Sequence, residues 1–104
     1  MTEPKVYNRY HRDAPPGTVY IGRGGYWGNP FVIGKDGDRD EVIAKHRAWL
    51  LGDAERARTT RAALAGKSVV CFCAPKPCHG DTLVEISNCD DETFEALLRE
   101  GDPR

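Results

Sequence analysis

The stretch Ser68-Val69-Val70-Cys71-Phe72-Cys73-Ala74 decides the fold of this chain. Nearly all of its residues are apolar, which is typical of a strand covered on both faces at the centre of a parallel sheet. The chain cannot continue as a strand through Pro75 and Pro77, because proline has no backbone N–H to donate. Two more short strands are predicted on the N-terminal side, over residues 5–10 and 18–21.

Helices are predicted between and after these strands. Asp38, followed three residues later by Glu41, is typical of a capping box, and the helix that it begins ends at Gly52. A second helix is predicted over 53–65, where a thin apolar face favours a surface position. Two more are predicted over 80–87 and from Asp91 onward. In the first helix, residues at helical spacing form one face that consists of Val42, Ile43, His46, Trp49 and Leu50.

This alternation of strands and helices predicts a single compact α/β domain over residues 1–104, with a small, mainly parallel sheet flanked by helices in a Rossmann-like three-layer arrangement. Parallel strands bring the loops that follow them to the same edge of the sheet. The 22–30 loop and the 74–81 loop should therefore face each other and form a cleft, at the edge where α/β sheets bind ligands.

Charge and hydropathy exclude several classes of protein. The formal net charge is −1, so bulk nucleic-acid binding is not expected. No apolar run approaches the roughly 20 residues that cross a membrane, and the N-terminus has no apolar signal-peptide core. We therefore expect a cytoplasmic protein, whose four cysteines stay reduced and are metal ligands, reactive thiols or buried residues.

Three motifs resemble a known family. They are Tyr20-Ile21-Gly22-Arg23, Trp27-Gly28-Asn29-Pro30-Phe31 and the segment from Cys71 to Asp81. In this order they resemble an uncharacterised family of phage and bacterial proteins, domain of unknown function 4326. The resemblance implies no particular reaction, and it would imply the host cytoplasm if a phage encodes the protein.

The 74–81 loop carries the predicted reacting groups. Cys78 lies where a helix begins, and the free N–H groups of a helix N-terminus stabilise a thiolate. His79 and Asp81 supply an acid or base and a positioning carboxylate, so the predicted catalytic residues are Cys78, His79 and Asp81. A zinc site is the alternative, with the ligands Cys71, Cys73, Cys78 and His79. A third alternative is that these cysteines are simply buried residues.

The 22–30 loop carries the predicted ligand contacts. Its glycines let backbone N–H groups approach an anion, the arginine can hold a phosphate or carboxylate, and the tryptophan can stack on a base. Lys76 of the other loop adds a positive charge. The predicted ligand-binding residues are Gly22, Arg23, Gly24, Gly25, Trp27, Asn29 and Lys76.

The leading hypothesis is a small enzyme, or an enzyme-like binder, for a nucleotide, nucleoside or other phosphorylated ligand in the cleft between the two loops. One alternative is a zinc-binding module. Another is a phage-encoded interaction protein that binds a host partner. The sequence does not predict the substrate, the reaction or the oligomeric state.

Overall fold

The central strand lies where the sequence places it. The structure, a computed structural model, describes residues 4–12, 14–22, 25–73 and 76–100. Strand β3 (Val69–Cys71) pairs in parallel with β1 (Val6–Asn8) on one side and with β2 (Val19–Tyr20) on the other. The sheet order is therefore β1-β3-β2, and all three residues of β3 are buried. This confirms the predicted parallel pairing and the central position of the apolar strand.

The first strand is shorter than predicted because its last residue turns the chain. The side chain of Asn8 accepts a hydrogen bond from the backbone N–H of Tyr10 at 2.9 Å. This contact caps a short 3₁₀-helix, η1 (Arg9–His11), in place of a continued strand.

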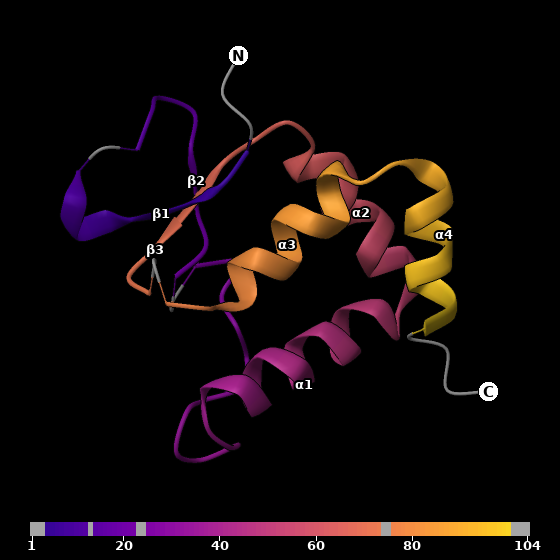
Figure 1. Ribbon diagram of the computed structural model, residues 1–104, viewed down its shortest axis with the longest axis horizontal. Coiled ribbons are helices and arrows are strands. Elements are labelled where there is room, and N and C mark those ends of the chain that lie inside the picture. Colours follow the sequence, from indigo (N-terminus) through magenta and orange to yellow (C-terminus); the bar gives the residue numbers. More distant parts are fainter. Residues whose placement is uncertain (1–3, 13, 23–24, 74–75, 101–104) are drawn as a thin grey trace.

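Four helices follow, each within a few residues of its predicted position. They are α1 (Arg39–Leu51), α2 (Ala54–Leu64), α3 (His79–Asn88) and α4 (Asp91–Glu100). Figure 1 shows the small sheet toward one end of the molecule and α4 toward the other, with α3 and α2 between them. None of the helices in the described part of the chain is long and apolar enough to cross a membrane.

Hydrogen bonds at the helix starts explain where the helices begin. The capping box predicted for α1 is present: Asp38 accepts from the N–H of Glu41 at 2.9 Å, and Glu41 accepts from the N–H of Asp38 at 3.1 Å. Helix α4 begins at Asp91 as predicted, one residue after its cap. Asp90, not Asp91, accepts the N–H of Thr93 at 2.7 Å.

Helix α2 buries only a thin face, as predicted for a surface helix, and its opposite face is exposed. Ala57, Thr60 and Leu64 are buried, and the Ser87 hydroxyl of α3 donates to the Thr60 carbonyl at 3.5 Å. The side chains of Ala57 and Thr60 are small, so the two helices can lie close together. The core that they share with the sheet consists of Ile21, Leu50, Leu51, Ala57, Leu64, Val69, Cys71, Cys78, Leu83, Ile86 and Phe94.

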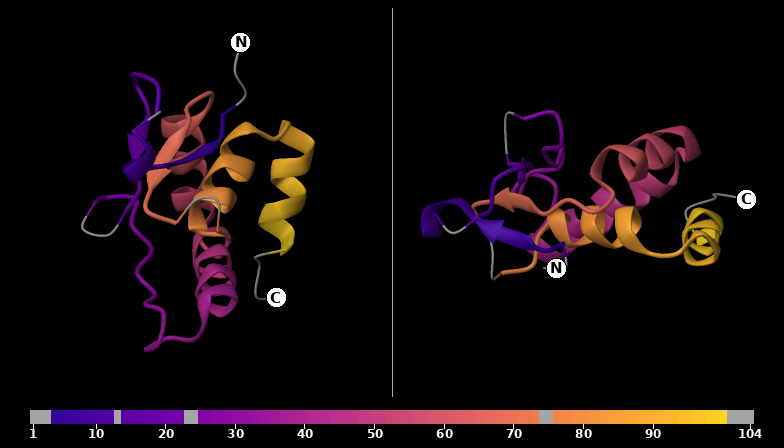
Figure 2. Two further views of the ribbon diagram at one scale, coloured as in Figure 1. Left: turned by 60° about the vertical axis from the view of Figure 1, so that its left-hand side comes forward. Right: turned by 90° about the horizontal axis from the view of Figure 1, so that it is seen from above.

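The two faces of the sheet differ. Because side chains alternate along a strand, Val69 and Cys71 share the face that belongs to the core. Phe72 and the Tyr20 ring meet on the other side with centroids 6.2 Å apart, and Tyr10 adds a ring 4.9 Å from Phe72. Phe72 is 43% exposed and Tyr10 77%. The α/β class is therefore confirmed, whereas the Rossmann-like three-layer detail is not (Figure 2).

Candidate functional site

The two motif loops border one cleft. A pocket of about 230 Å³ is lined by Gly22 and Asn29 from the first loop and by Pro77, Cys78 and His79 from the second. The sulfur-bearing residues Cys71 and Cys73 also line it, as does the start of α1. The carboxyl ends of two parallel strands thus bring together loops that are about 50 residues apart in sequence.

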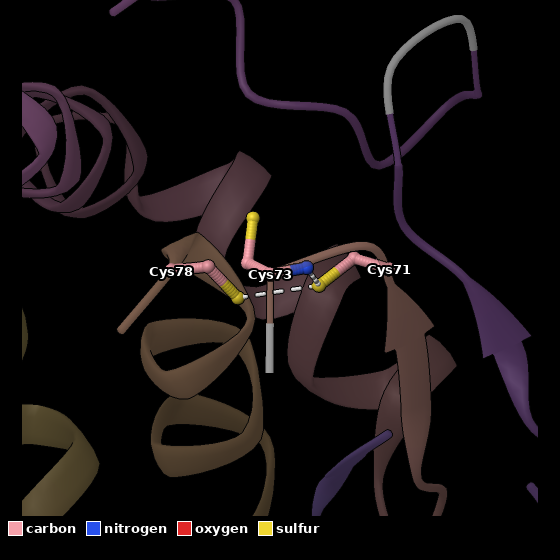
Figure 3. A group of neighbouring side chains, drawn as sticks. All are labelled: Cys71, Cys73 and Cys78. Carbon is pink, nitrogen blue, oxygen red and sulfur yellow. Dashed lines mark hydrogen bonds between the residues drawn. The ribbon is translucent and has the colours of Figure 1, made fainter. Parts of the chain in front are cut away.

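Three cysteine sulfurs gather at this cleft. The Sγ atoms of Cys71, Cys73 and Cys78 all lie within 4.8 Å of one another, and those of Cys71 and Cys78 are 3.5 Å apart. Cys71 ends β3, Cys73 follows it, and Cys78 caps α3. In Figure 3 the side chains of Cys71 and Cys78 point toward each other, while Cys73 stands to one side, so the sulfurs form a triangle.

Backbone N–H groups donate to two of the three sulfurs. The N–H of Cys73 donates to Cys71 Sγ at 3.4 Å, and that of Gly80 donates to Cys78 Sγ at 3.3 Å. Such donors stabilise negative charge on sulfur. In the protein alone, however, the hydrogen bond with Cys71 and then burial raise the pKa of Cys78 well above its usual range. The helix start therefore does not by itself produce the thiolate expected from its position.

Asp81 holds the start of helix α3. Its carboxylate accepts from the Cys78 N–H at 3.2 Å, which completes a capping box of which Cys78 Sγ is the other half. The side chain of Asp81 is exposed. This hydrogen bond holds the Cys78 backbone in a position where the Cys78 sulfur lies 3.5 Å from the Cys71 sulfur. A catalytic role for Cys78, His79 and Asp81 stays a prediction.

His79 is not in the group of three sulfurs, and the four-ligand set of Cys71, Cys73, Cys78 and His79 stays a prediction. Its Nε2 lies 2.9 Å from the Ile21 carbonyl and 3.0 Å from the Trp27 carbonyl. Both partners are acceptors, so Nε2 carries a proton and donates to them. Burial lowers the pKa of His79, so the ring is neutral near pH 7. It joins α3 to the loop that follows β2.

The 22–30 loop is held by its own side chains. Asn29 Nδ2 donates to the Val42 carbonyl of α1 at 3.3 Å, and Asn29 Oδ1 accepts from the Phe31 N–H at 2.9 Å. At Gly22, a Cβ would clash with the ring of Tyr20. The N–H of Gly25 donates to the Gly22 carbonyl at 3.1 Å. These contacts fix the shape of the loop.

Other predicted ligand contacts lie away from the cleft or outside the described residues. Of the predicted ligand contacts, Arg23 and Gly24 lie outside the described residues. Lys76 is exposed, and its N–H donates to the Cys73 carbonyl at 2.8 Å. The side chain of Trp27 lines a different pocket of about 410 Å³, here named the tryptophan pocket, together with Tyr26, Gly28, His46, Trp49, Leu50, Asp53, Glu55, Arg56, Thr59, Thr60 and Leu83.

Sequence reasoning missed the part of the cleft that α1 supplies. Arg39 lines it and donates to the Pro77 carbonyl at 3.0 Å, while Val42 and Ile43 add apolar surface. The capping box predicted the start of α1, but no sequence signal placed that start against the 74–81 loop.

The geometry defines a class of protein: an α/β domain with a parallel sheet and a cluster of thiols at the carboxyl edge of that sheet. Residues 6–89 match the family described as Domain of unknown function (DUF4326), and the chain belongs to that family. A protein of Enterobacteria phage T4, "Uncharacterized 12.4 kDa protein in nrdA-td intergenic region", is 36% identical over 88 residues, which are 81% of this chain and 77% of the phage protein. No solved structure matches the chain significantly.

Proposed function

We propose that this protein is a zinc-binding module in which Cys71, Cys73 and Cys78 bind one metal ion at the wall of the cleft. The observation that supports it best is the grouping of the three Sγ atoms within 4.8 Å of one another. Zinc binds thiolates at about 2.3 Å in tetrahedral geometry, which separates the sulfurs by roughly 3.8 Å. A small shift of the Cys73 side chain would bring all three sulfurs to this separation.

The chemistry of the donors supports a metal better than a free nucleophile. The raised pKa of Cys78 reflects a sulfur that shares its surroundings with another thiol and is shielded from water. A divalent cation reverses this balance, since a coordinating thiol is deprotonated outright. The backbone N–H groups that donate to Cys71 and Cys78 would then act as the outer hydrogen bonds that orient thiolate ligands.

Three protein ligands would leave one coordination position for water or for an atom of a bound molecule, as in catalytic rather than structural zinc sites. Whether the protein is an enzyme stays open in this proposal. Reduced thiols are required, and all four cysteines are free in the structure. We therefore keep the cytoplasm, or the host cytoplasm for a phage-encoded protein, as the location.

The experiment is metal analysis of the purified protein, followed by exchange of the metal for cobalt. We expect about one zinc per chain and the strong thiolate-to-cobalt charge-transfer absorption of a tetrahedral site. Cys73→Ser and Cys78→Ser should lose both signals. Cys89→Ser is the matched control, because Cys89 is partly buried near Arg61 and outside the sulfur group. Metal-free protein, or full metal binding by Cys73→Ser, would contradict the proposal.

The phosphorylated-ligand hypothesis for the same cleft stays a prediction that depends on Arg23. Arg39, a described cation at the cleft, already donates to the Pro77 carbonyl. The hypothesis of a host protein partner likewise stays a prediction.

A further inference from the structure

The tryptophan pocket adjoins the cleft, because His46 of this pocket and His79 of the cleft have ring centroids 5.0 Å apart. Its volume of about 410 Å³ is within the usual range of about 300–1,000 Å³ for small-molecule sites. It is bordered by Trp27 of the loop, by His46 and Trp49 of α1, and by the first two turns of α2. None of the three cysteines of the proposed metal site lines it.

Aromatic rings dominate one side of this pocket. Trp27 is partly buried and lies edge-on to Tyr26, with centroids 4.8 Å apart. Tyr26 is 86% exposed, so its ring is open to a ligand at the mouth of the pocket. The Trp49 ring lies 5.7 Å from that of His46. Rings in these orientations offer stacking surface to a planar ligand.

His46 marks the pocket as a polar site. Its side chain is only 2% exposed, and Nδ1 has no hydrogen-bond partner among the described residues. A buried polar atom without a partner is destabilising, and a ligand that supplies the partner removes that penalty. Burial, and then repulsion from His79, lower the pKa of His46 to about 3, so the ring is neutral and can donate or accept one hydrogen bond. Buried groups with perturbed pKa values inside a pocket are frequent at functional sites.

The charges at the rim select against an anionic ligand. Arg56 is the cation of this pocket. Its guanidinium lies 4.0 Å from the Trp49 ring centre, donates to the Trp49 carbonyl at 3.2 Å and lies 3.7 Å from the Asp53 carboxylate. Glu55 adds an exposed carboxylate that belongs to no ion pair of the described residues. A phosphate would meet two carboxylates and a cation whose contacts are already made.

We propose that the tryptophan pocket binds an uncharged planar heterocycle of the nucleobase or nucleoside class, stacked on Trp27 and hydrogen-bonded to His46 and to the Thr59 hydroxyl. Nucleobases carry both donors and acceptors on their edges, which suits a neutral imidazole, a hydroxyl and carboxylates. The imidazole can turn about its Cβ–Cγ bond to present Nδ1 to the ligand. This inference does not depend on the proposed metal site.

The chain offers a direct probe of occupancy, because both of its tryptophans line this pocket. Adenosine, guanosine, cytidine, uridine and thymidine are titrated one at a time into the full chain, and tryptophan fluorescence and heat are recorded. We expect saturable quenching with at least one nucleoside. Its 5′-monophosphate should bind more weakly, because the rim carboxylates repel the phosphate.

The variants separate this proposal from non-specific stacking. His46→Leu and Thr59→Val should each weaken binding by roughly tenfold, which corresponds to about 1.4 kcal/mol. Thr93→Val is the matched control, because Thr93 is an exposed threonine of α4 that does not line the pocket. It should bind like the unaltered chain.

Three results would overturn the proposal. They are no saturable signal with any of the nucleosides, unchanged affinity in both His46→Leu and Thr59→Val, and tighter binding of the monophosphate than of the nucleoside. Metal content tests the cysteine site and nucleoside titration tests this pocket, and neither His46 nor Thr59 belongs to the sulfur group, so failure of one proposal is distinguishable from failure of the other.

Discussion

Acid should destabilise this protein through His46. The pKa of this imidazole is lowered from 6.5 to about 3 in the folded chain, chiefly because the ring is buried. Between these two pKa values the unfolded chain binds a proton that the folded chain does not. The stabilising contribution of neutral His46 is therefore complete above pH 6.5 and is lost progressively as the pH falls toward 3.

The size of the effect follows from the two pKa values. One pKa unit corresponds to about 1.36 kcal/mol. The stabilisation lost on acidification therefore approaches about 5 kcal/mol as the pH falls to the folded-state pKa of about 3, and it is about 2–3 kcal/mol at about pH 4.5. His79, which packs on His46 with ring centroids 5.0 Å apart, also has a lowered pKa and acts in the same direction. A comparison of variants is therefore needed to isolate His46.

Urea unfolding at about pH 7.5 and about pH 4.5, at equal metal content, measures the difference. His46→Leu removes the titrating ring and keeps a helix former at this position. Between the two pH values it should lose about 2–3 kcal/mol less of its free energy of unfolding than the unaltered chain does. Acidic residues and His79 titrate in both proteins and largely cancel. Equal losses in the two proteins would refute the reasoning.

Three further substitutions test the packing. Gly80→Ala should lower the free energy of unfolding by about 1–2 kcal/mol in urea titrations, because its Cβ would lie 2.6 Å from Cδ1 of the fully buried Ile21; an unchanged midpoint would contradict this. Asp38→Ala removes a helix cap and should cost about 1 kcal/mol by thermal unfolding, and an equal melting temperature would argue against the capping box. Arg61→Met loses a hydrogen bond of 2.9 Å to the Ile86 carbonyl and should cost about 1–3 kcal/mol, whereas Arg58→Met, which loses an exposed ion pair with Glu95 and a contact of 5.6 Å with the Phe94 ring, should cost less than about 1 kcal/mol.

Local signals in the sequence predicted the fold well. An apolar run identified β3 as the central strand, and Asp38, with Glu41 three residues later, identified the start of α1. The parallel pairing of β2 with β3 then placed two distant loops at one cleft. The thin apolar face predicted for α2 is the face that the helix buries, and the small side chains of Ala57 and Thr60 on that face allow close helix packing.

The contents of the site were harder to predict. Cys71 ends a strand that the sequence predicted, but Cys73 and Cys78 reach the sulfur group through a loop whose path no periodicity describes. The direction of Trp27 was unpredictable for the same reason, since it lies in an irregular loop. His46 stood in a helical stripe between apolar neighbours. Only the tertiary structure shows that its Nδ1 has no partner among the described residues.

The contact between His46 and His79 has a consequence for how the two pockets communicate. His79 lines the cleft, His46 lines the tryptophan pocket, and their rings meet edge to face 5.0 Å apart. The two imidazole rings therefore lie between the cleft and the tryptophan pocket and border both. An occupant that turns one ring changes the space left for the other, and the resulting coupling free energy is reciprocal. Any factor by which a metal in the cleft alters affinity for a heterocycle is the same factor by which that heterocycle alters affinity for the metal.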